Sequence, residues 1–249
     1  MLNGSTTRPA LAGEIACDFS GAYRPRRGNA ATEEPLSPEA RAEMIGQAAR
    51  KIEELFDILL IDHSADPNTR DTPRRVATAF VEELLSGRYT PPPRVTQFDD
   101  VHSSDELIVT GPIEVRSMCA HHLMPIYGHA VIGILPDADG RLVGLSKYDR
   151  IVDHFARRLQ SQEELVRQIG DFIVEKTRPR GLIIRMSAVH MCKTHRGVHA
   201  SHSGRMVNFY SYGELESDGA ARRAFLSECT GMEAGLTAGE LLRGGLSLR

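Results

Sequence analysis

The chain has 249 residues, of which 41% are hydrophobic and 25% are charged, as in an ordinary globular protein of one or two domains. Its Lys and Arg side chains number 30 against 33 Asp and Glu, and this balance argues against a strongly basic nucleic-acid binder. No apolar run approaches the roughly 18–20 residues of a membrane-spanning helix. Four cysteines in so long a chain do not make a disulfide framework. We therefore expect a cytoplasmic protein without a nucleic-acid or membrane partner.

The first part of the chain predicts an extension followed by two helices. Residues 1–36 show no periodicity and no apolar core of an export signal, so we expect a disordered extension. Ser37, followed by Pro and Glu, has the pattern of a helix start, and apolar residues then recur every three or four positions to residue 59. A second helix is expected over 72–87, with Gly87 ending it. Residues 37–90 thus form a helical N-terminal segment.

Beyond a proline-rich linker at 91–93 the hydrophobic period changes from helical to strand-like. Strands are expected over 106–116, 126–135, 142–145, 182–191 and 205–212. Residues 147–176 are expected to be helical, with a break near Ser161, which forms a possible capping box with Glu164. This order predicts an α+β fold with a largely antiparallel sheet. We place a catalytic domain at 91–228 and a tail of ambiguous structure at 229–249.

The chemically distinctive residues are concentrated in one third of the chain. Eight of the ten histidines lie between residues 119 and 202, together with two of the four cysteines. Thiolates and imidazoles are the ligands that zinc prefers, and a catalytic zinc keeps one position open for water. Cys119, His122 and Cys192 could supply three such ligands. The alternative is that the cysteines are buried apolar residues and the histidines are hydrogen-bonded polar ones.

Proton transfer and anion binding have their own candidates in this region. His121 and His190 flank the possible metal ligands, and imidazole titrates near neutral pH. Five polar or cationic residues could bind phosphate oxygens, with the pair at 146–147 placed at an expected helix start: Arg75, Ser146, Lys147, Arg150 and Arg196. Each of them could equally be a solvated surface residue.

The pair Gln162–Glu163 could recognise a guanine base. A carboxylate beside an amide can accept from the N1–H and 2-amino groups, which point the same way. An acid on a helix is otherwise usually a solvated surface group, so the pair alone does not establish a nucleotide site.

Several motifs together resemble the GTP cyclohydrolase I family over roughly residues 45–215. They occur in the family's order at compatible spacings: Asp71–Ala77, Ser117–Pro125 (SMCAHHLMP), Gly144–Lys147 with Arg150–Val152, Phe155–Gln160, Gln162–Glu163, and His190–Cys192 with Arg196–Val198. The resemblance implies a tunnelling fold, in which an antiparallel sheet carries paired helices on one face. It also implies a ring assembly, a homodecamer of two pentamers, with active sites between subunits.

The resemblance further implies a function for each candidate residue. It implies zinc-dependent opening of the imidazole ring of GTP, release of formate and rearrangement to 7,8-dihydroneopterin triphosphate. The implied roles are zinc ligation by Cys119, His122 and Cys192, catalysis by His121, His190 and Ser146, triphosphate binding by Arg75, Ser146, Lys147, Arg150 and Arg196, and guanine recognition by Gln162 and Glu163.

The sequence departs from the family pattern close to these motifs. Ala120 stands where the family usually has Glu, and Lys193 and His195 replace apolar residues that precede Arg196. These changes are either neutral variation in an enzyme that acts on GTP, which we expect, or the mark of an alternative substrate, a modified guanine nucleotide such as 8-oxo-GTP, because specificity depends on a few buried polar contacts. A second alternative is a catalytically silent ring that binds nucleotide.

Overall fold

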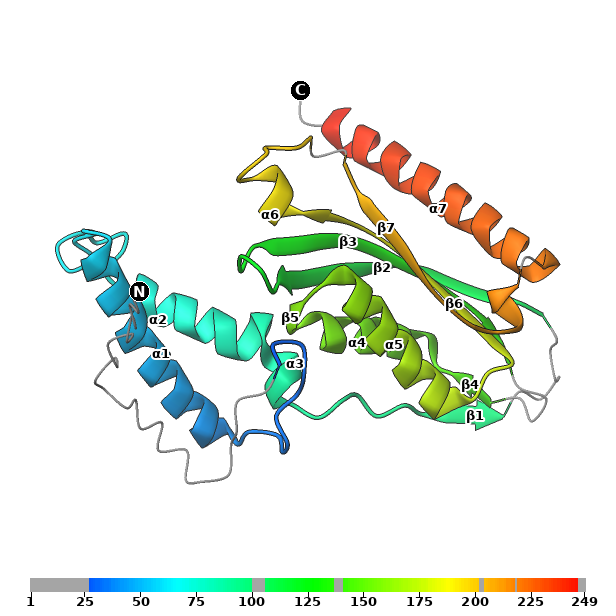
Figure 1. The fold of residues 1–249 in the computed structure, drawn as a ribbon, viewed down its shortest axis with the longest axis horizontal. Helices are drawn as coiled ribbons and strands as arrows, with labels where there is room; N and C mark the ends of the chain where they lie inside the picture. Colours follow the sequence, from blue (N-terminus) through cyan, green and yellow to red (C-terminus); the bar gives the residue numbers. More distant parts are fainter. Residues whose placement is uncertain (1–26, 100–105, 137–140, 202–203, 218, 246–249) are drawn as a thin grey trace, which may run out of the picture.

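The computed structural model describes residues 27–99, 106–136, 141–201, 204–217 and 219–245. It shows an α+β architecture in which N-terminal helices precede a curled sheet, two helices lie on one face of that sheet, and a long helix follows at the C-terminal end (Figure 1). The predicted fold class is confirmed. Within the described residues, none of the helices combines the length and the apolar character that crossing a membrane requires.

The N-terminal segment is helical, as expected. Its elements are α1 (Pro38–Ile58), α2 (Thr72–Thr78), the π-helical η1 (Ala79–Leu84) and α3 (Ser86–Tyr89). The predicted start of α1 is confirmed, because the Ser37 hydroxyl accepts a hydrogen bond from the Ala40 amide at 3.2 Å. The single helix predicted over 72–87 is instead divided into three short segments, α2, η1 and α3.

The prediction that Gly87 ends the second helix is wrong. Gly87 lies inside α3, where a Cβ atom would come within 1.9 Å of the His154 carbonyl oxygen. The glycine is therefore required for close packing between two helices rather than for a left-handed helix end.

Part of the predicted N-terminal extension belongs to the folded body. Leu36 is only 4% exposed, the Thr32 amide donates to the Arg88 carbonyl at 2.8 Å, and the Leu159 amide donates to the Gly28 carbonyl at 3.2 Å. The expectation of disorder is therefore wrong for residues 27–36, because their backbone groups find partners on later elements. Residues 1–26 lie outside the described residues.

The main sheet has five strands in the order β5-β2-β3-β6-β7. They are β2 (Ile108–Cys119), β3 (Pro125–Leu135), β5 (Leu159–Gln160), β6 (Gly181–His190) and β7 (Met206–Gly213). The β2–β3, β3–β6 and β6–β7 pairs are antiparallel, as predicted, whereas the short β5 adds a parallel pair to β2. A separate ribbon pairs β1 (Gln97–Asp99) with β4 (Arg141–Val143). The periodicity did not predict β1 or β5, because strands of two or three residues show no alternation.

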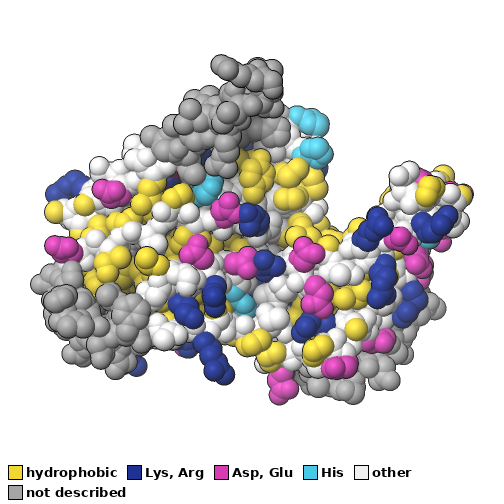
Figure 2. Space-filling model, turned by 180° about the vertical axis from the view of Figure 1, so that it is seen from behind, with side chains coloured by type: hydrophobic (Ala, Val, Ile, Leu, Met, Phe, Trp, Pro, Cys, Tyr) yellow, Lys and Arg dark blue, Asp and Glu magenta, His cyan; other side chains and the backbone are white. Residues whose placement is uncertain are grey.

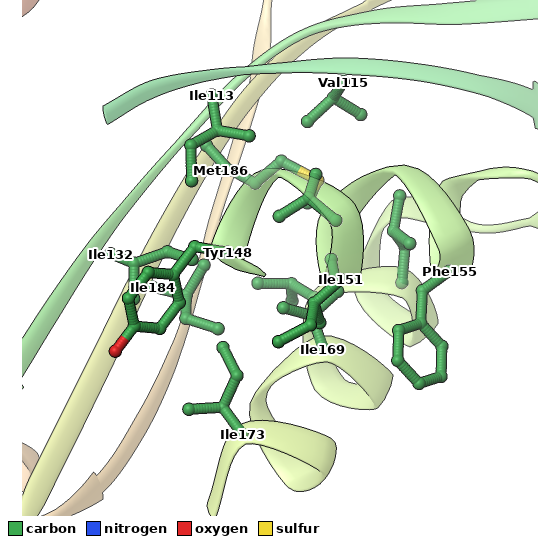
Figure 3. Close-up of a cluster of buried hydrophobic side chains, with 14 of the residues drawn as sticks. Ile113, Val115, Ile132, Tyr148, Ile151, Phe155, Ile169, Ile173, Ile184 and Met186 are labelled. Carbon is green, nitrogen blue, oxygen red and sulfur yellow. The ribbon is translucent and has the colours of Figure 1, made fainter. Parts of the chain in front are cut away.

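Two helices cover one face of the main sheet and build the principal core. They are α4 (Leu145–Ala156) and α5 (Gln162–Thr177), and the predicted break between them is confirmed, because Ser161 caps α5 by accepting from the Glu164 amide at 3.3 Å. Figure 3 shows Ile132 and Ile184 from the strands and Ile151 and Ile169 from the helices meeting in this core.

The opposite face of the sheet is partly covered by α7 (Ala220–Gly245). Val131 and Ile183, which alternate with the residues of the principal core, pack there with Phe225 and Cys229. Helices therefore lie on both faces, although the resemblance implies them on one face. Since α7 runs through position 228, the structure marks no break at the expected start of the C-terminal tail, and the predicted domain boundaries stay predictions.

Charges of both signs are mixed on the surface. Figure 2 shows Lys and Arg side chains interspersed with Asp and Glu across the face turned to the viewer, without a field of one sign. This distribution agrees with the formal net charge of −3. It gives no support for a nucleic-acid interface on that face.

The packing of α7 leads to a stability prediction. Phe225 is fully buried and lies against Gly133 and Ile183, so we expect Phe225→Ala to lower the free energy of unfolding by about 3–5 kcal/mol. Its neighbour Leu226 is 38% exposed, and Leu226→Ala is the matched control with a small expected effect. Urea unfolding followed by circular dichroism measures both variants. Equal losses in the two variants would show that α7 does not depend on this contact.

Candidate active site

A tight turn between β2 and β3 places two of the candidate metal ligands together. The Cys119 amide donates to the Met124 carbonyl at 2.8 Å, and the Leu123 amide donates to the Cys119 carbonyl at 3.0 Å. Leu123 adopts a left-handed φ of 52°, which closes the turn. Cys119 is thus the last residue of β2 and is buried, whereas His122 lies exposed on the turn itself.

The third candidate ligand arrives through the pairing of β3 with β6. In that register Ile126 lies opposite His190, so the end of β6 lies beside the start of β3. The chain then enters the short α6 (Met191–Thr194), whose first turn carries Cys192. Cys192 follows the paired His190 by two positions, which brings its thiol next to the β2–β3 turn.

The donor atoms of Cys119, His122 and Cys192 all lie within 4.8 Å of one another. Burial and the hydrogen bond with the neighbouring Cys119 thiol raise the pKa of the Cys192 thiol. Two thiolates and one imidazole fit zinc, which takes sulfur and nitrogen ligands at about 2.0–2.3 Å. The predicted metal triad is therefore assembled by the fold and could hold a zinc ion.

Two further predicted residues lie in contact with this triad. The Nδ1 atom of His121 is 3.6 Å from the Cys119 sulfur, and the Arg196 guanidinium contacts Nε2 of His122 at 2.9 Å. Arg196 therefore lies directly beside the metal position. His121 is exposed and has an ionisable ring next to a ligand sulfur.

His190 is the last residue of β6 and is held by Gln162. Its Nε2 atom is 2.8 Å from the Gln162 side-chain oxygen. Burial lowers the pKa of His190, while the nearby carboxylate of Glu163 acts in the opposite direction. Glu163 itself is exposed at the first turn of α5 and is free to face a ligand.

Gln162 differs from its expected role as a reader of guanine. Its side chain is fully buried, and the amide groups are engaged by Met186, Met206, Asn208 and His190. The side chain cannot turn towards a base without breaking these bonds. Glu163 remains the better placed member of the predicted pair.

The remaining predicted residues are not brought to the metal end of the sheet within this chain. Ser146 and Lys147 begin α4, whereas the last residue of that helix, Ala156, accepts a hydrogen bond from Ser117 beside the metal turn. At 1.5 Å per residue, the helix separates Ser146 from that end by about 15 Å. Arg150, one turn further along, lies among residues of the proline-rich linker.

Arg75 belongs to the N-terminal helices. It is exposed on α2, pairs with Asp71 at 3.3 Å and lines a shallow surface cavity with Arg74 and Glu83. Within one chain the structure thus divides the predicted site residues into a metal group, which includes Arg196, and a cationic group that lies away from it and consists of Arg75, Ser146, Lys147 and Arg150.

Sequence reasoning missed two residues that support the metal group. The Gln160 carbonyl accepts from the Ala120 amide at 2.9 Å and ties the metal turn to β5. Asn208 contacts Gln162 through both its side-chain oxygen, at 2.7 Å, and its side-chain nitrogen, at 3.3 Å. A signal for Asn208 existed, because it is a polar residue on the core-facing side of a predicted strand, between Met206 and Tyr210.

Comparisons with known proteins agree with this arrangement. A GTP cyclohydrolase 1 of Mycobacterium leprae is 51% identical over 130 residues, which cover 51% of this chain and 62% of the relative, so that the match spans less than two thirds of that relative's length. The GTP cyclohydrolase 1 of Mycobacterium marinum is 41% identical over 169 residues, covering 66% of this chain and 82% of the relative. That of Thermobifida fusca is 40% identical over 151 residues, with coverage of 59% and 72%.

Among solved structures, an archaeosine synthase QueF-Like in the apo form aligns with 43% of this chain and 92% of its own, at 12% identity and a TM-score of 0.32, which is too low to support a conclusion. The family model described as GTP cyclohydrolase I matches residues 48–230, a range that contains all the predicted site residues. Together with the assembled Cys119–His122–Cys192 triad, this match shows that the chain belongs to the GTP cyclohydrolase I family.

Proposed function

We propose that this protein hydrolyses the imidazole ring of GTP, releases formate and rearranges the product to 7,8-dihydroneopterin triphosphate. The observation that carries the proposal is the Cys119–His122–Cys192 triad with two histidines, His121 and His190, beside it. Such a set combines three metal ligands with two proton carriers in one place. The family relatives named GTP cyclohydrolase 1 supply the substrate class.

The triad is the proposed site of a catalytic zinc ion. When bound there, zinc would supply the Lewis acidity that makes water a nucleophile near neutral pH. The residues of this chain hold and transfer protons. His190 donates a proton to a ring nitrogen of the purine, and His121 and Ser146 assist the later rearrangement of the opened product. The exposed carboxylate of Glu163 binds the guanine edge.

The cationic group is the proposed triphosphate site. Ser146 and Lys147 offer a hydroxyl, an ammonium group and the amides of a helix N-terminus, and Arg150 lies one turn on. Arg75 and Arg196 would add guanidinium groups, which pair with phosphate oxygens in a fork geometry. Binding energy gained there, far from the reacting carbon, would position the base over the metal.

The separation of the two groups favours a site shared between subunits. One chain leaves Ser146 about 15 Å from the end of α4 that lies beside its own metal turn, as the length of α4 requires. The sheet ends at β7, an edge strand on which Val207, Phe209 and Tyr212 are each about 40% exposed. Association of subunits would cover this edge and bring the two groups together, as expected for a homodecameric ring. We place the assembly in the cytoplasm.

The metal assignment predicts the effect of removing one thiol. Cys192→Ser should lose most of its zinc, because serine replaces a thiolate by a poorly coordinating hydroxyl. Cys229→Ser is the control, since Cys229 lies on α7 in a separate buried cluster and its replacement should leave the zinc content unchanged. Elemental analysis of both proteins, purified with zinc, measures the stoichiometry. Full zinc occupancy in Cys192→Ser would contradict the assignment.

The proposed reaction is tested with a panel of nucleotides. Zinc-loaded protein is incubated separately with GTP, 8-oxo-GTP, GDP, GMP and ATP, and formate and pterin products are followed by mass spectrometry. We expect formate and dihydroneopterin triphosphate from GTP alone. If 8-oxo-GTP is consumed and GTP is left intact, the substrate is a modified guanine nucleotide and the proposal of GTP is wrong. This is the alternative raised by the departures from the family pattern at Ala120, Lys193 and His195. Zinc-loaded protein that binds nucleotides without turnover would indicate a catalytically silent ring.

The shared site is tested by mixing two inactive variants. Lys147→Ala lacks a residue of the cationic group and His190→Ala lacks one of the metal group, so neither should be active by itself. If neighbouring subunits contribute the two groups, co-expression should restore activity to roughly one quarter of the sites, because a site is then complete only when each group comes from the variant that retains it. Sites complete within one chain would give no activity in the mixed assembly.

A further inference from the structure

Gln162 is the most completely engaged polar side chain beside the metal triad. It is 0% exposed, although it stands at the first position of α5, next to exposed Glu163. Its amide nitrogen lies 3.2 Å from the Met186 carbonyl oxygen, 3.1 Å from the Met206 carbonyl oxygen and 2.7 Å from the Asn208 side-chain oxygen. Its amide oxygen lies 2.8 Å from Nε2 of His190.

This environment permits only one orientation of the amide. Met186 and Met206 contribute main-chain carbonyl oxygens, which can only accept hydrogen bonds. If the amide were turned over, its oxygen would face these two oxygens, and a buried acceptor would be left without a donor. The nitrogen must therefore point towards β6 and β7, and the oxygen must point towards His190.

The orientation of the amide decides the state of the His190 ring. The Gln162 oxygen carries only lone pairs, so Nε2 of His190 has to bring the hydrogen. In a neutral imidazole one nitrogen carries the hydrogen and the other is the base. With Nε2 protonated, Nδ1 is the nitrogen that is left to accept or deliver a proton.

We propose that Gln162 is a positioning residue that holds His190 in its Nε2–H form, so that His190 exchanges protons with the substrate through Nδ1. Asn208 supports this role: it accepts from the Gln162 side chain and its own amide nitrogen donates to the Gln162 carbonyl at 3.3 Å. Gln162 then acts through His190 and does not read the base. The inference rests on the proposed function, since it takes His190 as a proton carrier in the purine reaction.

Steady-state kinetics separates positioning from base recognition. We compare Gln162→Met, which keeps the length but removes the amide, with Glu163→Gln on the adjacent position. Substrates are GTP and inosine triphosphate, which lacks the 2-amino group. Zinc content and the unfolding midpoint are measured for each variant, so that loss of metal or of fold is recognised.

A positioning role predicts a change in kcat rather than in KM. Gln162→Met should lower kcat at least about tenfold for both nucleotides with KM nearly unchanged, because a wrongly held proton carrier forfeits general acid catalysis. Glu163→Gln should raise KM for GTP more than for inosine triphosphate. A Gln162→Met protein with normal kcat and a raised KM for GTP alone would overturn the inference and make Gln162 a reader of the base.

The ring can also be observed without turnover. Solid-state NMR of zinc-loaded wild-type protein with ¹⁵N-labelled histidine, with His190→Gln used for assignment, should show a protonated Nε2 and an unprotonated Nδ1 at His190. An unprotonated Nε2 overturns the inference whether or not Gln162→Met folds. If wild-type protein turns over no nucleotide, the proposed function fails separately, and the NMR result still decides the state of the ring.

Discussion

The antiparallel pairing of β3 with β6 is the constraint on which the site depends. Its register sets Ile126 opposite His190, and this fixes where α6 begins relative to the β2–β3 turn. A slip of one residue would turn every side chain of β6 to the other face of the sheet. Ile184 and Met186 would leave the principal core, and Cys192 would move away from the metal turn. The buried strand face therefore brings Cys192 to Cys119 and His122, two ligands that are far from it in the sequence.

Polar groups around the metal position are held by main-chain atoms of the sheet and its helices. The Gln160 carbonyl fixes the turn at Ala120, and the carbonyls of β6 and β7 fix the Gln162 amide. Main-chain groups of a paired sheet move little, so they orient these side chains more firmly than surface side chains would. Precise placement of proton carriers is what general acid–base chemistry requires, since a proton moves only over hydrogen-bond distances.

The same fold leaves the chain incomplete as a catalyst under the proposed function. Ser146 and Lys147 begin helix α4, so they lie about one helix length from its other end, where Ser117 donates to the Ala156 carbonyl. The exposed apolar side chains on edge strand β7 remain to be covered. Pairing of sheet edges between subunits would cover the exposed side chains of β7. It would also allow the cationic group of one chain to face the metal group of another.

The sequence by itself determined the helix start at Ser37, the N-cap at Ser161, the α+β order and the identity of the candidate metal ligands, because each depends on local pattern or on residue chemistry. Tertiary structure alone decided the roles of Gly87 and Gln162. Gly87 resembles a helix end in sequence but lies against the His154 carbonyl, and Gln162 resembles a base reader but is buried among carbonyls of two strands. The reason is physical: which atoms approach a residue from distant elements is set by packing and strand register, and neither leaves a signal in the residue's own neighbourhood.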